Sequence, residues 1–253
     1  MAQPAVDGLR VTDIGGHPLE DGGWFRTGSV FRISGGMIGA AEIAHLDAIG
    51  LRVLVDLRGG KDEDRSTLED WARSRGVLYR VEPMNLGSAA DFVAAVGEHG
   101  ITEADGIAYL EAIYRRMLDE FPAQLAGALS AIATAQPAGF GCAAGKDRTG
   151  LLTALLQDFL GVDRSAILAG YVNNAPDPER LLEAVGSWWD WEEGDLTKPG
   201  LGAILSAVEE VMASALEYLD ERHGGSRRYL EESGVSAETL ARLRECLVAD
   251  EPV

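Results

Sequence analysis

The alternation of predicted helices and strands in the first third of the chain is the feature that most constrains the fold. Apolar residues at helical spacing over 39–49 precede the mostly apolar segment Leu51–Arg58, which predicts a buried strand. A second helical segment, Thr67–Arg75, leads into a second predicted strand, Val77–Val81. Strands separated by helices favour parallel pairing, because a parallel strand is reached only through a long crossover, which is usually a helix.

Helical patterns dominate the rest of the chain. The spacing of apolar residues predicts helices over 104–118, 122–135, 151–160, 165–173 and 201–221, with a last helix after Ser236. Near the N-terminus, Trp24–Phe31 predicts a strand interrupted by Gly28. We therefore expect residues 1–253 to form one α/β domain. Its central, mostly parallel sheet would have about four or five strands, flanked by helices, with additional helices at the C-terminus.

The composition excludes several classes of protein. In 253 residues, 22 lysines and arginines stand against 41 aspartates and glutamates, which gives a formal net charge of −19. Such a charge repels polyanions, so we expect neither a nucleic-acid-binding protein nor a general affinity for anionic membranes. No apolar stretch approaches the ~18 residues needed to cross a bilayer, so we expect no membrane span.

Two features predict a cytoplasmic protein. Residues 1–8 have neither the basic nor the apolar region of a signal peptide. The two cysteines, Cys142 and Cys246, lie far apart, which is poor material for a disulfide framework and fits a reducing compartment. The four histidines are scattered without the spacing of metal ligands, so the sequence predicts no metal site.

One segment, Phe140–Gly150, carries groups with reactive chemistry. Cys142 ends a short apolar run, a glycine-containing turn follows, and Arg148 precedes the helix predicted from Leu151. Unpaired N–H groups and the dipole at a helix N-terminus attract an anion and favour the thiolate form of a cysteine. The planar guanidinium of Arg148 can bind two phosphate oxygens at once. The segment therefore combines a nucleophile with a site for a phosphoryl group.

Two other interpretations of this segment fit less well. A nucleotide-binding P-loop requires G-x-x-x-x-G-K-[ST], but Phe140 stands where the first glycine belongs and Asp147 where the serine or threonine belongs. The plainer alternative is a buried cysteine before an ordinary turn whose charged residues are solvated. The presence of Gly145, Thr149 and Gly150 beside the cysteine and the arginine makes that alternative the weaker one.

The segment resembles the C-x5-R-[ST] signature of cysteine-dependent phosphatases. Its string C-x-x-G-K-D-R-T-G is similar to that of the bacterial branch of atypical protein-tyrosine phosphatases, relatives of enzymes that also accept phosphoinositides. Less specific similarities to the same family cover nearly the whole chain, at Asp13–Gly16, Val30–Gly35, Leu46–Arg58, Ile167–Asn174 and Tyr218–Leu230. The resemblance implies a protein-tyrosine-phosphatase-like fold and hydrolysis of phosphate monoesters in two steps, without a metal or a cofactor.

The resemblance also implies a role for each residue of the segment. Cys142 would form a phosphocysteine intermediate, and Thr149 would donate a hydrogen bond to the thiolate and ease its departure in the second step. Arg148 and the backbone N–H groups of the loop would hold the phosphoryl group; the loop comprises Ala143, Ala144, Gly145, Lys146, Asp147 and Arg148. The Lys146 side chain would bind additional phosphates or acidic headgroups, or else be solvated or paired with a carboxylate.

The sequence departs from the family at two positions. Gly141 stands where the family has a histidine that fixes the loop geometry and the charge of the thiolate by hydrogen bonding. Thr12 stands where the family favours an arginine, which indicates a changed rim of the site and a different substrate. We expect the dipoles of the loop and the charge of Arg148 to maintain the thiolate without the histidine.

The general acid that protonates the leaving oxygen is the least determined assignment. Asp147, inside the loop, is the first candidate, with the alternative that it pairs with Lys146 and positions it. Asp56, at the end of an apolar strand, is the second, with the alternative that it pairs with Arg58 and supports the loop from behind. Asp91 is a third and poorer candidate.

We predict a phosphoric monoester hydrolase whose partner is a phosphate-ester substrate, and a phosphotyrosine protein follows from the resemblance alone. A small phosphorylated metabolite, such as a nucleotide, a sugar phosphate or a biosynthetic intermediate, is one alternative. A phosphoinositide, suggested by Lys146, is another. The stretch Trp188–Trp191 is expected to cover the edge of the core or to contact the substrate as a lid. A different class is a non-catalytic module that uses the loop only to bind phosphorylated partners.

Overall fold

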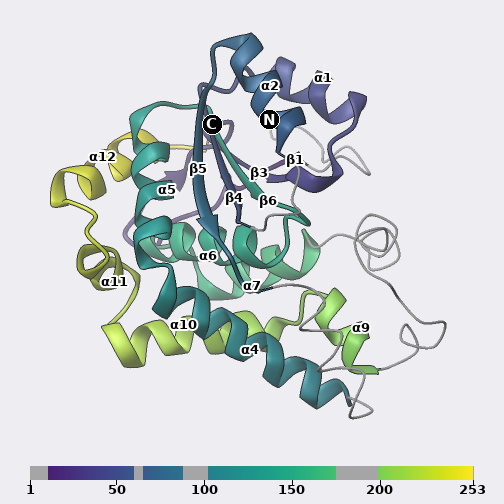
Figure 1. The fold of residues 1–253 in the computed structure, drawn as a ribbon. Coiled ribbons are helices and arrows are strands. Elements are labelled where there is room, and N and C mark those ends of the chain that lie inside the picture. Colours follow the sequence, from purple (N-terminus) through teal and green to yellow (C-terminus); the bar gives the residue numbers. More distant parts are fainter. Residues whose placement is uncertain (1–10, 60–64, 88–101, 175–198, 253) are drawn as a thin grey trace.

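The computed structural model describes residues 11–59, 65–87, 102–174 and 199–252. These residues form a five-stranded sheet with helices on both of its faces (Figure 1). In their order across the sheet, the strands are β1 (Val11–Asp13), β3 (Val30–Ser34), β6 (Ala138–Cys142), β4 (Val53–Arg58) and β5 (Leu78–Met84). A separate antiparallel pair joins β2 (Trp24–Phe25) to β7 (Val248–Ala249).

The four neighbouring strands β3, β6, β4 and β5 are parallel, and β1 runs antiparallel to β3 at one edge of the sheet. The predicted α/β fold, with a mostly parallel central sheet flanked by helices, is therefore confirmed. The carboxyl ends of β6, β4 and β5 are Cys142, Arg58 and Met84, and they lie side by side along the carboxyl-terminal edge of the sheet. Open α/β sheets bind their ligands outside the carboxyl ends of the strands, so a site is expected at this edge.

The sheet separates two hydrophobic cores. Helices α1 (Ala40–Ile49) and α2 (Ser66–Arg75) cover one face, together at the top of Figure 1, in a core that includes Leu54 and Trp71. The other face carries a larger core, to which the predicted C-terminal helices belong. Its helices are α4 (Glu103–Glu120), α5 (Pro122–Thr134), α6 (Asp147–Leu160), α7 (Arg164–Asn173), α9 (Pro199–Leu205), α10 (Glu209–His223), α11 (Ser226–Glu232) and α12 (Ala237–Leu247).

Side chains along each strand alternate between these two cores, as the pleat of a strand requires. Val55 and Leu57 of β4 point into the larger core, and so do Phe140 and Cys142 of β6. Asp56 lies between Val55 and Leu57, so its side chain points to the face that α1 and α2 cover. The predicted nucleophile and this carboxylate therefore lie on opposite faces of the sheet.

The largest difference from the sequence-based prediction lies in 201–221, where apolar spacing predicted one helix. The structure instead has α9 and α10, which are bent by 62° at the break between them. A helix that ends leaves backbone carbonyls without partners. Here Lys146 donates to the carbonyls of Ile204 and Ser206, so a side chain distant in sequence stabilises the break.

Two other predicted boundaries of helices and strands differ from the structure, and one is confirmed. The predicted strand Trp24–Phe31 is in fact two strands in different sheets, with Gly28 at a φ of +69° between them. The helix predicted from Leu151 begins four residues earlier, at Asp147, so the end of the reactive segment forms the first turn of α6. The last helix begins after Ser236 as predicted, because this side chain accepts a hydrogen bond from the third backbone N–H beyond it.

Within the described ranges, no single helix is both long and apolar enough to cross a membrane. Only α9 and α10 taken together reach that length and apolar content, and they are the bent pair described above.

Gly106 of α4 lies against the backbone of α9. A Cβ at this position would be 2.4 Å from the carbonyl oxygen of Gly200. We expect Gly106→Ala to lower the free energy of unfolding by about 1–3 kcal/mol, because α9 must move. Gly170→Ala in α7, where no atom lies within 4 Å of the new Cβ, should instead raise it by up to about 1 kcal/mol. Urea denaturation compares the two variants, and stabilisation of both would contradict the close packing of α4 on α9.

Candidate active site

The predicted nucleophile ends the central strand of the sheet. Cys142 is the last residue of β6 and is only 2% exposed, and α6 begins at Asp147. Residues 143–146 form a short loop between the strand end and the first turn of α6. Because both ends of this loop belong to packed elements, its conformation depends on what holds its carbonyls and side chains.

The loop is held by β3 and by the residues that follow this strand. Three successive loop carbonyls accept hydrogen bonds from that side. They are Ala143 with the N–H of Gly36 at 2.9 Å, Ala144 with the hydroxyl of Ser34 at 2.9 Å, and Gly145 with the guanidinium of Arg32 at 2.5 Å. In a trans peptide the N–H points away from the C=O, so the next N–H in each case is directed away from β3. The loop thereby presents successive amides to one side, as anion-binding loops do.

Two glycines let the backbone approach β3 this closely. Gly145 has a φ of +70°, and a Cβ there would lie 2.3 Å from Ser34 Oγ. A Cβ on Gly141 would lie 2.2 Å from the carbonyl oxygen of Ile33. The histidine that the resemblance leads one to expect at this position therefore has no room in this chain.

Thr149, in the first turn of α6, is fully buried beside the cysteine. Its Oγ1 accepts a hydrogen bond of 2.9 Å from the backbone N–H of Cys142. A hydroxyl that accepts one bond keeps its own proton for a second bond, which it donates. This position is compatible with the role that the resemblance implies, a donor to the cysteine sulfur.

Arg148 extends to the carboxyl edge of the sheet. Its Nη1 donates to the carbonyl oxygens of Leu57 and Met84, both at 3.3 Å. These carbonyls belong to Leu57, the next-to-last residue of β4, and to Met84, the last residue of β5, and the carboxyl ends of both strands lie beside that of β6, which is Cys142. The structure therefore brings the predicted guanidinium clamp and the predicted nucleophile to one edge of the sheet.

Lys146 is buried, and its ammonium group forms an ion pair and hydrogen bonds with other residues of the protein. Its Nζ lies 2.7 Å from Asp147 Oδ1 and donates to the carbonyls of Ile204 and Ser206 at 2.8 and 3.1 Å. Burial lowers the pKa of Lys146, but the Asp147 carboxylate more than offsets this, so the net pKa is raised and the ammonium stays charged. An ammonium has three protons to donate, and three acceptors surround this one. Pairing with a carboxylate thus describes Lys146 better than binding of further phosphates.

Asp147 is positioned by a tyrosine from a distant helix. Tyr114 of α4 donates to Asp147 Oδ1 at 3.1 Å, and its hydroxyl lies 2.7 Å from that of Tyr171 in α7. Burial, together with the charge of Asp147, raises the pKa of Tyr114 well above its usual value, so its proton stays available for this bond. The Asp147 side chain is 29% exposed. It therefore combines a defined position with access from solvent.

The Asp56 side chain is hydrogen-bonded on the face of the sheet opposite to that of Cys142. Its carboxylate accepts hydrogen bonds from Arg58 Nη2 at 2.6 Å, from Arg58 Nε at 3.0 Å to each oxygen, and from the Tyr79 hydroxyl at 2.5 Å. Arg58 also donates to the carbonyl of Gly35 at 3.3 Å, next to the Gly36 amide that holds the loop. This geometry favours the alternative for Asp56, support of the loop from behind, over a role as the general acid.

Sequence analysis missed several residues that hold this site. They are Arg32, Ser34, Tyr79, Tyr114 and Tyr171. Arg32 alone carried a signal, because a charged residue within an apolar strand segment is costly to bury. The tyrosines occupy positions where sequence patterns do not distinguish a hydrogen-bonding hydroxyl from an ordinary aromatic ring.

Three further sequence-based expectations concern Asp91, the stretch Trp188–Trp191 and Thr12. Asp91, the third candidate acid, and Trp188–Trp191 lie outside the described residues. Thr12, where the family favours an arginine, lies on β1 and pairs directly with Arg32 of β3. Side chains of directly paired residues are neighbours on one face of a sheet. The departure at Thr12 is therefore adjacent to an arginine that holds the loop.

Comparison with known proteins identifies the family. A sequence profile described as "Tyrosine phosphatase family" matches residues 9–249. This chain belongs to the tyrosine phosphatase family. It is 31% identical over 170 residues to "Triple specificity protein phosphatase PtpB" of Mycobacterium tuberculosis, an alignment that covers 60% of this chain and 62% of that protein. It is 27% identical over 224 residues to "Tyrosine-protein phosphatase" of Nostoc commune, which covers 83% and 70% respectively.

Membership of the tyrosine phosphatase family confirms the resemblance that the loop and its flanking elements indicated. It also confirms the predicted class, a tyrosine-phosphatase-like phosphoric monoester hydrolase, at the level of the family. The aligned region spans 62% of the length of the mycobacterial relative. Among solved structures, P. aeruginosa TpbA is 15% identical, with a TM-score of 0.36 over 83% of this chain and 95% of that chain.

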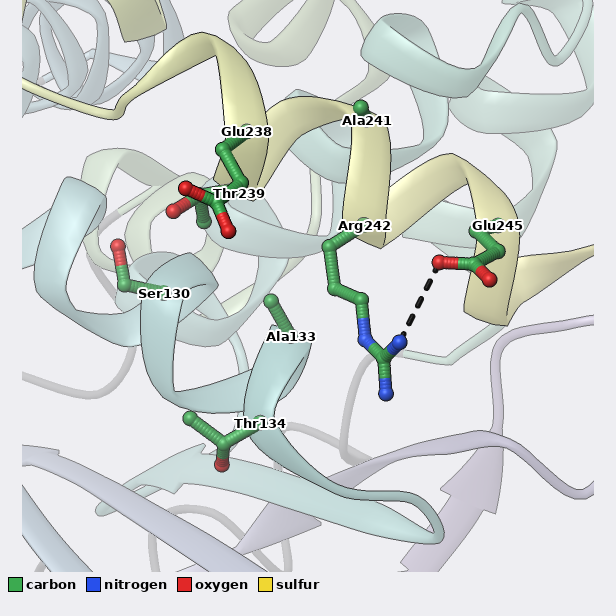
Figure 2. Close-up of a pocket in the computed structure, with 8 residues that line it drawn as sticks. All are labelled: Ser130, Ala133, Thr134, Glu238, Thr239, Ala241, Arg242 and Glu245. Atoms are coloured by element: carbon green, nitrogen blue, oxygen red, sulfur yellow. Dashed lines mark hydrogen bonds and ion pairs between the residues drawn. The ribbon is translucent and has the colours of Figure 1, made fainter.

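A surface pocket of about 700 Å³ lies between α5 and α12 (Figure 2). Thr134 of α5 and Arg242 of α12 help to line it, and Arg242 pairs with Glu245 at 3.3 Å. Thr134 precedes the amino end of β6, whereas Cys142 forms its carboxyl end. The pocket and the predicted nucleophile therefore lie at opposite ends of this strand, and the pocket is not part of the site.

A methyl group on Gly141 tests how closely the end of β6 is held against β3. Gly141→Ala places its Cβ against the backbone of Ile33, so we expect the free energy of unfolding to fall by about 1–3 kcal/mol or more. The matched control is Gly139→Ala on the same strand. Its Cβ would meet only side-chain ends, Leu51 Cδ1 at 2.8 Å and Ile33 Cδ1 at 2.9 Å, which can shift. Urea denaturation measures both variants, and equal losses would argue against a backbone constraint specific to Gly141.

Proposed function

We propose that this chain hydrolyses phosphate monoesters in two steps through Cys142. The main support is the loop whose three successive carbonyls bond toward β3, since its amides are then directed to the side where an anion can bind. The buried cysteine at one end of that loop, and Arg148 at the same edge of the sheet, supply the nucleophile and a cationic clamp. Membership of the tyrosine phosphatase family supports the same chemistry.

In the first step, the Cys142 thiolate attacks phosphorus opposite the leaving oxygen. The sulfur–phosphorus bond forms while the phosphorus–oxygen bond breaks, and Asp147 gives its proton to the leaving oxygen. The loop amides and the Arg148 guanidinium bind the other three oxygens, where negative charge is concentrated in the transition state. The products are the alcohol or phenol and a phosphocysteine.

In the second step, water attacks phosphorus and the sulfur–phosphorus bond breaks. The bonding electron pair returns to sulfur, and the carboxylate of Asp147 accepts a proton from the attacking water. The Thr149 hydroxyl, which lies against the backbone of Cys142, donates a hydrogen bond to the leaving thiolate. Inorganic phosphate is released and the thiolate is restored.

We assign the proton transfers to Asp147 and not to Asp56. Asp147 is 29% exposed at the start of α6, whereas Asp56 is buried on the other face of the sheet with both oxygens bonded to Arg58. The ion pair with Lys146 holds the Asp147 side chain in place. A negatively charged substrate beside a carboxyl group favours its acid form, which the first step needs.

For the substrate, we propose a phosphotyrosine protein, which the family and the name of the mycobacterial protein phosphatase support. A small phosphorylated metabolite is the alternative, favoured by Thr12 where the family has an arginine. A phosphoinositide loses its support, because Lys146 is engaged by Asp147 and by the end of α9. Both cysteines are free thiols, which supports the reducing cytoplasm as the place of this activity.

Hydrolysis of p-nitrophenyl phosphate in the presence of EDTA tests the reaction. The wild-type chain should release p-nitrophenol, and Cys142→Ser should show only background, because a serine hydroxyl is not ionised at neutral pH. Cys246→Ser, in α12, is the matched control and should keep the wild-type rate. Phosphate binding by a wild-type chain that shows no turnover would support the non-catalytic module instead.

Substrates with different leaving groups test the general acid. Asp147→Asn should lower kcat for phenyl phosphate by about 10²–10⁴-fold, because phenolate leaves poorly without a proton. The loss for p-nitrophenyl phosphate should be smaller, since p-nitrophenolate is a stable anion. Asp56→Asn, which would act through the position of the loop, should affect both substrates equally. An equal loss for both substrates in Asp147→Asn would contradict the assignment.

A further inference from the structure

Arg32 is an arginine buried in the middle of the sheet. It lies within β3, between β1 and β6, and only 5% of its surface is exposed. Among the described residues, no carboxylate lies within ion-pair distance of its guanidinium. A buried charge without a counter-charge is unfavourable, so an anion close to this guanidinium would stabilise it.

The Arg32 side chain extends toward the loop that follows Cys142, so an anion in that loop would lie close to it. Arg32 pairs with Phe140 in the parallel register of β3 and β6, and Phe140 points to the same face as Cys142. The guanidinium therefore lies on the cysteine's side of the sheet. Its Nη2 donates to the carbonyl of Gly145, within the loop that follows Cys142.

The charges around Arg32 agree with this placement. Burial lowers the pKa of Arg32, and Cys142, when ionised, opposes this most strongly, followed by Tyr114 and Tyr171. Arginine keeps its proton under all ordinary conditions, so Arg32 carries a positive charge within the sheet. The tyrosines are neutral at neutral pH, since a phenol titrates near pH 10 and burial raises the pKa of both further.

The other cations near the cysteine are already partnered. Lys146 is paired with Asp147 at 2.7 Å, which neutralises most of its charge. Arg58 is paired with Asp56 at 2.6 Å on the opposite face of the sheet. Arg148 bonds to strand-end carbonyls and is the proposed clamp for the substrate. Of the three buried cations Arg32, Lys146 and Arg58, Lys146 and Arg58 are paired with carboxylates, whereas the described contact of Arg32 is a carbonyl.

We propose that Arg32 is a positioning residue that stabilises the Cys142 thiolate from beneath the loop. Its charge acts in a chain that lacks the histidine of the family, for which Gly141 leaves no room. Its charge favours the sulfur anion, and its hydrogen bond to Gly145 keeps the loop carbonyl turned away from the substrate side. The inference rests on the proposed role of Cys142 as nucleophile.

Alkylation of Cys142 by iodoacetamide as a function of pH tests this inference, because only the thiolate reacts. Mass spectrometry of the peptide that contains Cys142 separates its reaction from that of Cys246 in the full chain. Arg32→Gln removes the charge but can still donate to the Gly145 carbonyl. We expect the midpoint of its alkylation profile to rise by about one pH unit, so that alkylation near neutral pH is about tenfold slower.

Ser34→Ala is the matched control. It removes the neighbouring hydrogen bond from β3 to the loop, at 2.9 Å to Ala144, without a change of charge. Because this bond also orients the loop, the midpoint of this variant should shift by clearly less than that of Arg32→Gln, whereas Arg32→Lys, which retains the charge, should keep the wild-type midpoint. A folded Arg32→Gln with the wild-type midpoint, or an equal shift in Ser34→Ala, would overturn the proposal.

The test remains decisive if Arg32→Gln does not fold. In that case Arg32→Lys supplies the test. An alkylation midpoint equal to that of the wild type supports the role of charge, and a rise of about one pH unit contradicts it. Thermal unfolding shows which variants are folded. Alkylation does not require turnover, so a wild type that hydrolyses no phosphate ester would defeat the proposed function and leave this measurement intact.

Discussion

The hydrogen bonds that turn three loop carbonyls toward β3 are the interaction on which the rest of the site depends. Neighbouring amides of a short loop have no intrinsic reason to point the same way, because each peptide can rotate about its φ and ψ. Donors from Gly36, Ser34 and Arg32 orient the carbonyls of the loop and hence the amides that follow them. Those amides then add to the positive end of the α6 dipole, which is where a phosphoryl group would bind.

Buried polar groups support this loop from both faces of the sheet. On the face of α1 and α2, Asp56 holds Arg58, which bonds to Gly35 beside the loop. On the other face, Lys146 joins the loop to the end of α9, while Tyr114 positions Asp147. Each of these side chains is costly to bury alone and is stabilised by its partners, so the set persists only as a connected network. The consequence is a loop organised before any substrate arrives.

Much of the fold follows from local patterns, and the exceptions have physical causes. The alternating segments between residues 39 and 81 predicted α1, β4, α2 and β5, because periodicity reports which face of an element is buried. The same periodicity predicted one helix over 201–221, since it does not register where backbone carbonyls find another partner. The loop itself was recognisable because its cysteine, glycine and arginine are close in sequence. The tyrosines that support it were not, because a buried hydroxyl and a buried ring give the same apolar signal.

By itself, the sequence determined which segments are helices or strands and the order of the reactive groups from Cys142 to Thr149, since both depend on short stretches of the chain. Tertiary structure alone decided what surrounds them. β6 inserts between β3 and β4, although it begins 104 residues after the end of β3 and 80 after the end of β4. This order brings Arg32 to a carbonyl 113 positions away. The same strand order places Asp56 on the face opposite Cys142. The physical reason is that hydrogen bonds between distant segments depend on strand order and register, which no local pattern encodes.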